Sequence, residues 1–346
     1  MAPFKSSLAR SAAKLFGVFN QRDLSLRGAT QDSKFVIPPG QATGGTVVGP
    51  YGGKTIHMFT SSGTFTANGS KTCEYVIVAG GAAGSSSGGG GTAGGGGGAG
   101  GYLTGTGLVL DGAYRVEVGD GGTCPAGGSG SPGDPSYIGP GPSWTGSVLP
   151  NNPTKGTHAI GGGRGGDYEP NTSADNGGSG GGGDYNSKPA GYGFNPTTPA
   201  PIRSGEPRYR DGDSQGQPGG DGTNNPEQIG GGGGGHGGAG TGGDGSTYAG
   251  GAGVRIPSTF HTPNVNIGAP GPAGSWYCCG GGGGARFSPG AGGPGGYGGG
   301  GNGRNGADGY SATASSGGGG GGVARADSNS GGSGGSGFVL IAYDEI

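Results

Sequence analysis

The sequence is poor in charged and apolar side chains for its length. Of its 346 residues, 12% are charged and 28% are hydrophobic, whereas an average soluble domain is about a quarter charged and nearly half apolar. The 19 basic and 21 acidic residues almost cancel, giving a net charge of -2, so charge repulsion does not hold the chain open. No basic stripe is present to neutralise phosphates, which excludes nucleic acid as the main partner. No apolar run approaches the length that a membrane span needs, so we expect none.

The sequence also lacks spacings typical of metal or catalytic sites. The four cysteines, Cys73, Cys124, Cys278 and Cys279, form no CxxC pair, so no zinc site is expected. The spacing leaves two alternatives for these cysteines: one or two disulfides to Cys73 and Cys124, or free buried thiols. Gly53-Lys54-Thr55 lacks the earlier glycine of a phosphate loop, since that position is Val48. The segment that begins at Asp211 resembles a calcium loop, but its twelfth position is Gly222 instead of a bidentate Glu.

None of the four histidines has a partner at ligand spacing, and no nucleophile with a histidine and an acid can be placed. We therefore expect no cofactor, no metal and no enzymatic activity.

Glycine is present in great excess, at 103 residues. No Gly-X-Y period holds, which excludes a collagen triple helix. One interpretation is that the tracts are disordered low-complexity sequence. The other is that they form extended polyglycine-II-like segments, whose N–H and C=O groups point sideways and bond to neighbouring segments. Tyrosines spaced through the tracts favour the ordered form.

Apolar runs bounded by turn residues predict four strands, near residues 56–66, 73–79, 113–118 and 338–343. The last lies more than 200 residues from the others, so a terminal strand that returns to them implies one closed domain. The predicted fold is therefore mainly β. A small β-sandwich-like core over 51–346 would carry long glycine-rich, polyglycine-II-like insertions.

The first 20 residues differ from the rest of the chain. Apolar side chains recur there at helical spacing and basic ones lie off that stripe, which predicts a short amphipathic helix. A helix that docks onto a partner protein is the favoured interpretation, and a transit peptide or a membrane-surface helix are the alternatives. The polar composition of residues 21–50, with Pro38 and Pro39, predicts an extended linker arm. The candidate docking residues are Phe4, Leu8, Leu15, Phe16 and Phe19.

Two groups of side chains in the glycine-rich part are candidate contacts for a receptor. Arg208, Tyr209 and Arg210 belong to its densest charge cluster, and Trp276 and Tyr277 are adjacent aromatics. Tyr, Trp and Arg dominate binding hot spots. The simpler interpretation is that the rings wedge between glycine-rich segments and that the charges lie on a solvated turn.

The order of these motifs resembles the glycine-rich domains of bacteriophage tail fibres and adhesins, including those of marine phages. The resemblance rests on HMFTSSGTFT, CEYVIVAGGAAGSSSGGGG, YRVEVGDGGT and GGSGFVLIAYDEI and covers roughly residues 51–346. It implies a structural protein on the phage particle surface, forming a homotrimer. The N-terminus would dock to other virion proteins, and the glycine-rich domain would recognise a host-surface glycan or protein.

This chain lacks the long shaft of a fibre, so a short spike, head fibre or adhesin suits its length better. A capsid decoration or head-fibre protein without a receptor is one alternative. A cellular glycine-rich matrix protein with a targeting peptide is another.

Overall fold

The structure is a computed structural model, and it describes most of the chain after residue 40. The described residues are 41–86, 92–140, 157–167, 173–186, 189–193, 214–224, 227–242, 247–262, 265, 267–287, 291–324 and 328–344. The amphipathic helix expected over residues 1–20 and the first part of the expected arm, 21–40, lie outside them.

The described part is mainly β, with antiparallel pairing predominant. The strands are β1 (Thr46–Tyr51), β2 (Lys54–Phe59), β3 (Gly63–Val78), β4 (Tyr102–Glu117), β5 (Ser136–Gly139), β6 (Thr157–Ala159), β7 (Val254–Arg255), β8 (Ala269–Pro270), β9 (Trp276–Cys278), β10 (Arg304–Asn305), β11 (Val323–Ala324) and β12 (Phe338–Asp344). Two short 3-10 helices, η2 (Ser258–Phe260) and η3 (Pro272–Gly274), lie between β7 and β9.

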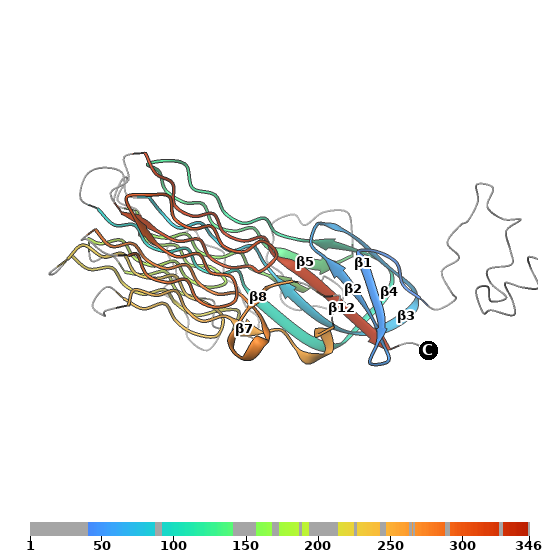
Figure 1. The fold of residues 1–346 in the computed structure, drawn as a ribbon. Coiled ribbons are helices and arrows are strands. Elements are labelled where there is room, and N and C mark those ends of the chain that lie inside the picture. Colours follow the sequence, from blue (N-terminus) through green and yellow to red (C-terminus); the bar gives the residue numbers. More distant parts are fainter. Residues whose placement is uncertain are drawn as a thin grey trace, which may run out of the picture. The chain divides into compact units, whose positions relative to one another are not determined.

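The main sheet has seven strands in the order β1-β2-β12-β3-β4-β5-β6 (Figure 1). Strand β12 pairs antiparallel with β2 through Leu340 and Met58, and with β3 through Leu340 and Val76. The C-terminal strand therefore lies between strands from the start of the domain. This confirms the prediction that the last strand returns to the first ones and closes one domain around a long insertion.

The sheet begins earlier than the expected domain boundary at residue 51. Residues 46–50, which we expected to belong to the linker arm, form most of β1 and pair with β2. Ala42 is buried in the core, and Thr43 forms a bridge with Thr66. The polar, Pro- and Gly-rich composition of this segment concealed a strand with a single buried apolar residue, Val48.

Both faces of the sheet are buried, because β12 alternates its side chains between two cores. Phe338, Leu340 and Ala342 face one core, and Val339, Ile341 and Tyr343 face the other. A strand buried on both faces reads as a continuous apolar run. That explains why this strand was evident in the sequence.

The half of the β3–β4 pair in which residues 63–67 lie opposite residues 112–116 packs into the core on the Ile341 face of β12. The pairing register shifts between Ala67 and Lys71, and such irregularities bend a strand. From this half, Phe65 packs edge-on against His57 of β2, with ring centroids 5.0 Å apart. The other core includes Cys278 of a separate three-stranded sheet, in the order β7-β9-β8, besides Leu340 of the main sheet. The structure thus confirms the mainly β class with antiparallel sheets.

The glycine-rich segments run side by side and bond to one another through the backbone (Figure 1). The segment 94–101 has the most regular pattern. Its N–H groups donate in rotation to three neighbouring segments: residues 94, 97 and 100 to 317–323, residues 95, 98 and 101 to 160–166, and residues 96 and 99 to 231–234. Three other segments donate to its carbonyl groups: 79–85, 179–182 and 282–285.

This segment therefore has six neighbours, and its bonding repeats every three residues. The eight bonds that it donates are 2.7–3.1 Å long, which is ordinary hydrogen-bond geometry. Most of its residues leave no room for a side chain. A Cβ on Gly101, for example, would lie 2.8 Å from the Ile160 carbonyl oxygen. The described glycine-rich segments are thus packed by backbone bonding to one another, which favours the ordered interpretation of these tracts.

Candidate binding surface

Only some of the predicted site residues fall within the described part of the chain. The docking candidates Phe4, Leu8, Leu15, Phe16 and Phe19 lie outside it, as do Arg208, Tyr209 and Arg210. Their roles therefore stay predictions. Trp276 and Tyr277 are described, and both belong to β9.

Both aromatics of β9 are half-buried and packed. Trp276 packs against the core on the Leu340 face of the main sheet. The Tyr277 ring meets Tyr297 edge to face, with centroids 5.0 Å apart and an interplanar angle of 84°. Gly271 lies directly beneath the Tyr277 ring, where a Cβ could not fit. These contacts correspond to the simpler interpretation, in which the rings fill space between glycine-rich segments.

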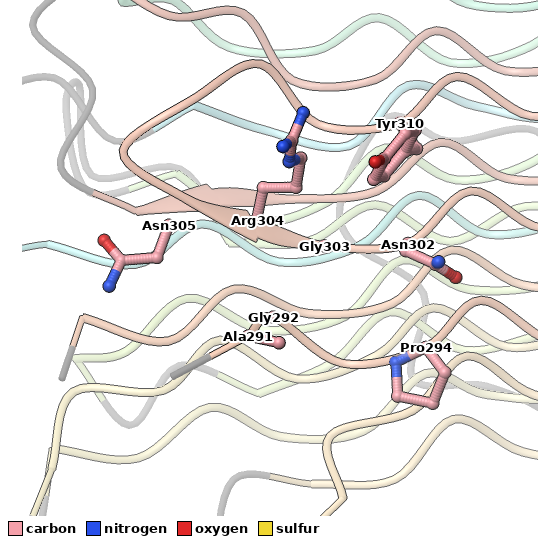
Figure 2. Close-up of a pocket in the computed structure, with 8 residues that line it drawn as sticks. All are labelled: Ala291, Gly292, Pro294, Asn302, Gly303, Arg304, Asn305 and Tyr310. Atoms are coloured by element: carbon pink, nitrogen blue, oxygen red, sulfur yellow. The ribbon is translucent and has the colours of Figure 1, made fainter. Parts of the chain in front are cut away.

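A concavity of about 420 Å³ lies elsewhere in the glycine-rich part, in a region that the sequence did not single out (Figure 2). Two neighbouring segments form it, 291–294 and 302–305, together with Tyr310. Its lining residues are Ala291, Gly292, Pro294, Asn302, Gly303, Arg304, Asn305 and Tyr310. The volume falls within the range of small-molecule sites.

Backbone bonds hold the two segments in register. Gly303 N–H donates to the Gly293 carbonyl at 2.9 Å, and Tyr310 N–H donates to the Asn302 carbonyl at 3.0 Å. The Arg304 N–H donates to the carbonyl of Gly322, the residue before β11, at 2.9 Å, and β10 pairs with β11. The walls of the concavity therefore belong to the bonded array of glycine-rich segments.

The polar chemistry of the concavity comes mainly from Arg304 and Tyr310. The Arg304 guanidinium carbon lies 4.6 Å from the centroid of the Tyr310 ring, within the range of a cation–π contact. The Tyr310 side chain is 52% exposed. In the described part of the chain, the four ion pairs involve other cations, so Arg304 is not neutralised by a carboxylate there.

Comparison with protein-family models shows the family of this chain. A family model described as a glycine-rich domain matches residues 60–344. The chain belongs to this glycine-rich domain family. The match begins after β2, although the structure places β1 and β2 in the same sheet as the matched strands. A search of curated proteins finds no significant match.

Burial perturbs two histidines of this glycine-rich domain. His57 shares a hydrogen bond of 2.7 Å between its Nδ1 and the Gly44 carbonyl oxygen, and burial lowers its pKa. Burial likewise lowers the pKa of His236, whose ring lies 4.9 Å from that of Tyr102. Burial therefore favours the neutral form of both imidazoles.

The four cysteines of the glycine-rich domain are buried free thiols, which decides between the two possibilities left open by their spacing. Burial raises the pKa of Cys73 to about 12 and that of Cys278 well above its ordinary value. Reactive cysteines have lowered pKa values and some exposure. These thiols therefore act as small apolar groups in the core.

The described residues contain no cluster of three His, Cys, Asp or Glu side chains that could hold a metal ion. They also contain no helix with the length and apolar character needed to cross a bilayer.

Proposed function

We propose that this glycine-rich domain is a non-enzymatic structural component of a virus particle: a tail fibre, spike or adhesin of a tailed phage. Its N-terminus would dock to other virion proteins, and the domain would face a host-surface glycan or protein. We further propose that it assembles as a homotrimer. The resemblance of its strands and tracts to phage tail-fibre domains supports this assignment.

We also propose that the glycine-rich segments form a polyglycine-II bundle. The supporting observation is the three-residue rotation of hydrogen bonds along residues 94–101, because a threefold extended helix has three residues per turn. Such a bundle satisfies its backbone without a hydrophobic core. It therefore suits a protein that must be rigid and exposed outside a cell.

Backbone bonding between the glycine-rich segments is the observation that carries the proposed structural role. It holds exposed aromatic side chains on a backbone-bonded scaffold, with Tyr192 46%, Tyr297 43% and Tyr310 52% exposed. Exposed aromatics supply contact area at low entropic cost, and they are enriched in binding hot spots.

Immunogold labelling of particles, purified from a culture that produces the protein, tests this proposal. We expect label on the tail or its tip, and expect the purified domain to block adsorption. Label on the capsid without an effect on adsorption would instead favour a decoration or head-fibre protein. Protein absent from particles, with an N-terminus lacking Met1, would favour a cellular matrix protein with a cleaved targeting peptide.

A deletion variant tests the docking role of the N-terminus. The deletion should end at residue 39. A longer deletion would approach Thr43, which forms a bridge with Thr66 of β3, and then β1 itself. We expect this variant to fold and to be missing from particles. Normal incorporation of the shortened protein would refute docking through the N-terminus.

A further inference from the structure

We infer that the concavity between segments 291–294 and 302–305 is a binding site for an acidic sugar, a ring that carries a carboxylate or phosphate group. The Arg304 guanidinium would bind the anion, and Tyr310 with Pro294 would contact the ring. This inference rests on the proposed host-surface role and gives that role a site and a ligand class.

The anion specificity follows from the donors that line the site. Arg304 presents a planar fork of N–H groups, which matches carboxylate and phosphate oxygens. The Asn302 Oδ1 accepts the Gly295 N–H at 2.7 Å, so the side-chain amide nitrogen of Asn302 is directed away from that bond as a further donor. None of the eight lining residues is acidic. A site with donors and no carboxylate favours an anion over a cation.

The sugar specificity follows from the apolar part of the lining. Tyr310 is half exposed beside Arg304, and the Pro294 and Ala291 side chains lie along the opposite segment (Figure 2). A sugar ring has apolar C–H faces and a polar edge, so it can pack on an aromatic ring while its hydroxyls meet donors and acceptors. The concavity of about 420 Å³ gives room for a small saccharide.

The site is built before any ligand arrives. Asn302 is held by its side chain and by its carbonyl, which accepts the Tyr310 N–H at 3.0 Å. The opposite wall is anchored by the Tyr248 hydroxyl, which donates to the Ala291 carbonyl at 3.1 Å. Little ordering would be needed on binding, which favours affinity even for a small ligand.

Titration of the full chain with small saccharides, followed by calorimetry, tests the inference. The probes are trigalacturonic acid, its methyl ester, glucose 6-phosphate and maltotriose. We expect at least one acidic probe to bind, and we expect the uncharged methyl ester and maltotriose to bind at least about tenfold more weakly, since charge-assisted hydrogen bonds are the strong ones. The two acidic probes distinguish a carboxylate ligand from a phosphate ligand.

Matched variants locate the site. R304Q should weaken binding of the acidic probe at least about tenfold, whereas R255Q should not, because Arg255 is exposed on β7 outside the concavity. Likewise, Y310A should weaken binding and Y51A should not, because Tyr51 is exposed on β1 outside the concavity. Unchanged thermal unfolding of each variant shows that the fold is retained.

Several outcomes would overturn the inference: no binding of either acidic probe, equal binding of maltotriose, or unchanged affinity in R304Q. Protein that is present on the particle surface but binds neither acidic probe would overturn this site alone. Acidic-sugar binding by a protein that is absent from particles would support the site and overturn the virion assignment.

Discussion

Replacing Gly97 by Ala tests whether backbone packing without side chains stabilises the domain. Gly97 lies in the middle of segment 94–101, bonded through its N–H to the Gly320 carbonyl at 2.8 Å. A Cβ at this position would meet the Ala82 carbonyl oxygen first. It would also lie 2.7 Å from the carbonyl carbon and oxygen of Ala83.

The expected cost follows from how far this neighbouring backbone must move. Ordinary van der Waals contact begins at 3.4 Å, so the Ala83 carbonyl must retreat by about 0.7 Å, the difference from 2.7 Å. The Ala82 carbonyl accepts the Gly320 N–H at 2.9 Å, and a similar shift would stretch that bond to about 3.6 Å, beyond hydrogen-bond range.

Overpacking costs about 1–3 kcal/mol, and one or two lost backbone bonds cost about 1 kcal/mol each. The alanine returns about 0.5 kcal/mol by restricting the unfolded chain. We therefore expect the free energy of unfolding to fall by about 2–4 kcal/mol.

Urea unfolding followed by circular dichroism measures this change, and Gly238 supplies the matched control. A Cβ on Gly238 would lie 3.5 Å from the Ala252 nitrogen and 3.6 Å from its Cβ, so G238A should change stability by less than about 0.5 kcal/mol. Equal stability of G97A and G238A would refute the packing argument.

Three further predictions concern the core. Truncation after Gly337 removes β12 from between β2 and β3, so the shortened chain should fail to fold; a cooperative thermal transition would contradict this. Burial lowers the pKa of His57 below the ordinary 6.5, so the unfolded chain binds its proton at higher pH than the folded protein. The free energy of unfolding that depends on neutral His57 is therefore fully present above about pH 6.5 and is lost as the pH falls below that value. The free energy of unfolding of H57Q should depend less on pH between about 7 and about 5, and an unchanged slope would show that His57 is not responsible. The four buried thiols should react with Ellman's reagent only in denaturant, and rapid labelling of any one in native buffer would contradict their burial.

The strands of the main sheet could be predicted from the sequence where burial on both faces gave continuous apolar runs. Phe338–Asp344 and the second half of β3 are of this kind. Strand β1 was hidden because five of its six residues are exposed. The first half of β4 was missed as well, since threonines and glycines interrupt its apolar residues.

The sequence could predict that the glycine-rich tracts are structurally ordered, but not which tract bonds to which. Sequence indicates that the segments can bond to one another, but every tract looks alike. Nothing in the residues at 94–101 specifies that 317–323, 160–166 and 231–234 accept their hydrogen bonds. Backbone groups carry no side-chain identity, so the pairing of segments is set by the topology of the whole insertion.

The candidate site was missed for a related reason. Its Arg304 and Tyr310 lie in a short polar interval between two glycine runs, which reads as a turn. The stretch from Asn302 to Tyr310 carries an arginine and two asparagines, and that concentration of donors was the available signal. Only folding of the chain brings segment 291–294 beside it.

Amide hydrogen exchange, resolved by peptide mass spectrometry, tests most directly whether backbone bonds order the glycine-rich part. Amides in stable, bonded structure exchange only when it opens. We predict that peptides covering residues 94–101, 231–235 and 317–322 will be protected to nearly the same degree as β12. Exchange of these peptides at the rate of an unstructured chain, with β12 still protected, would contradict the account.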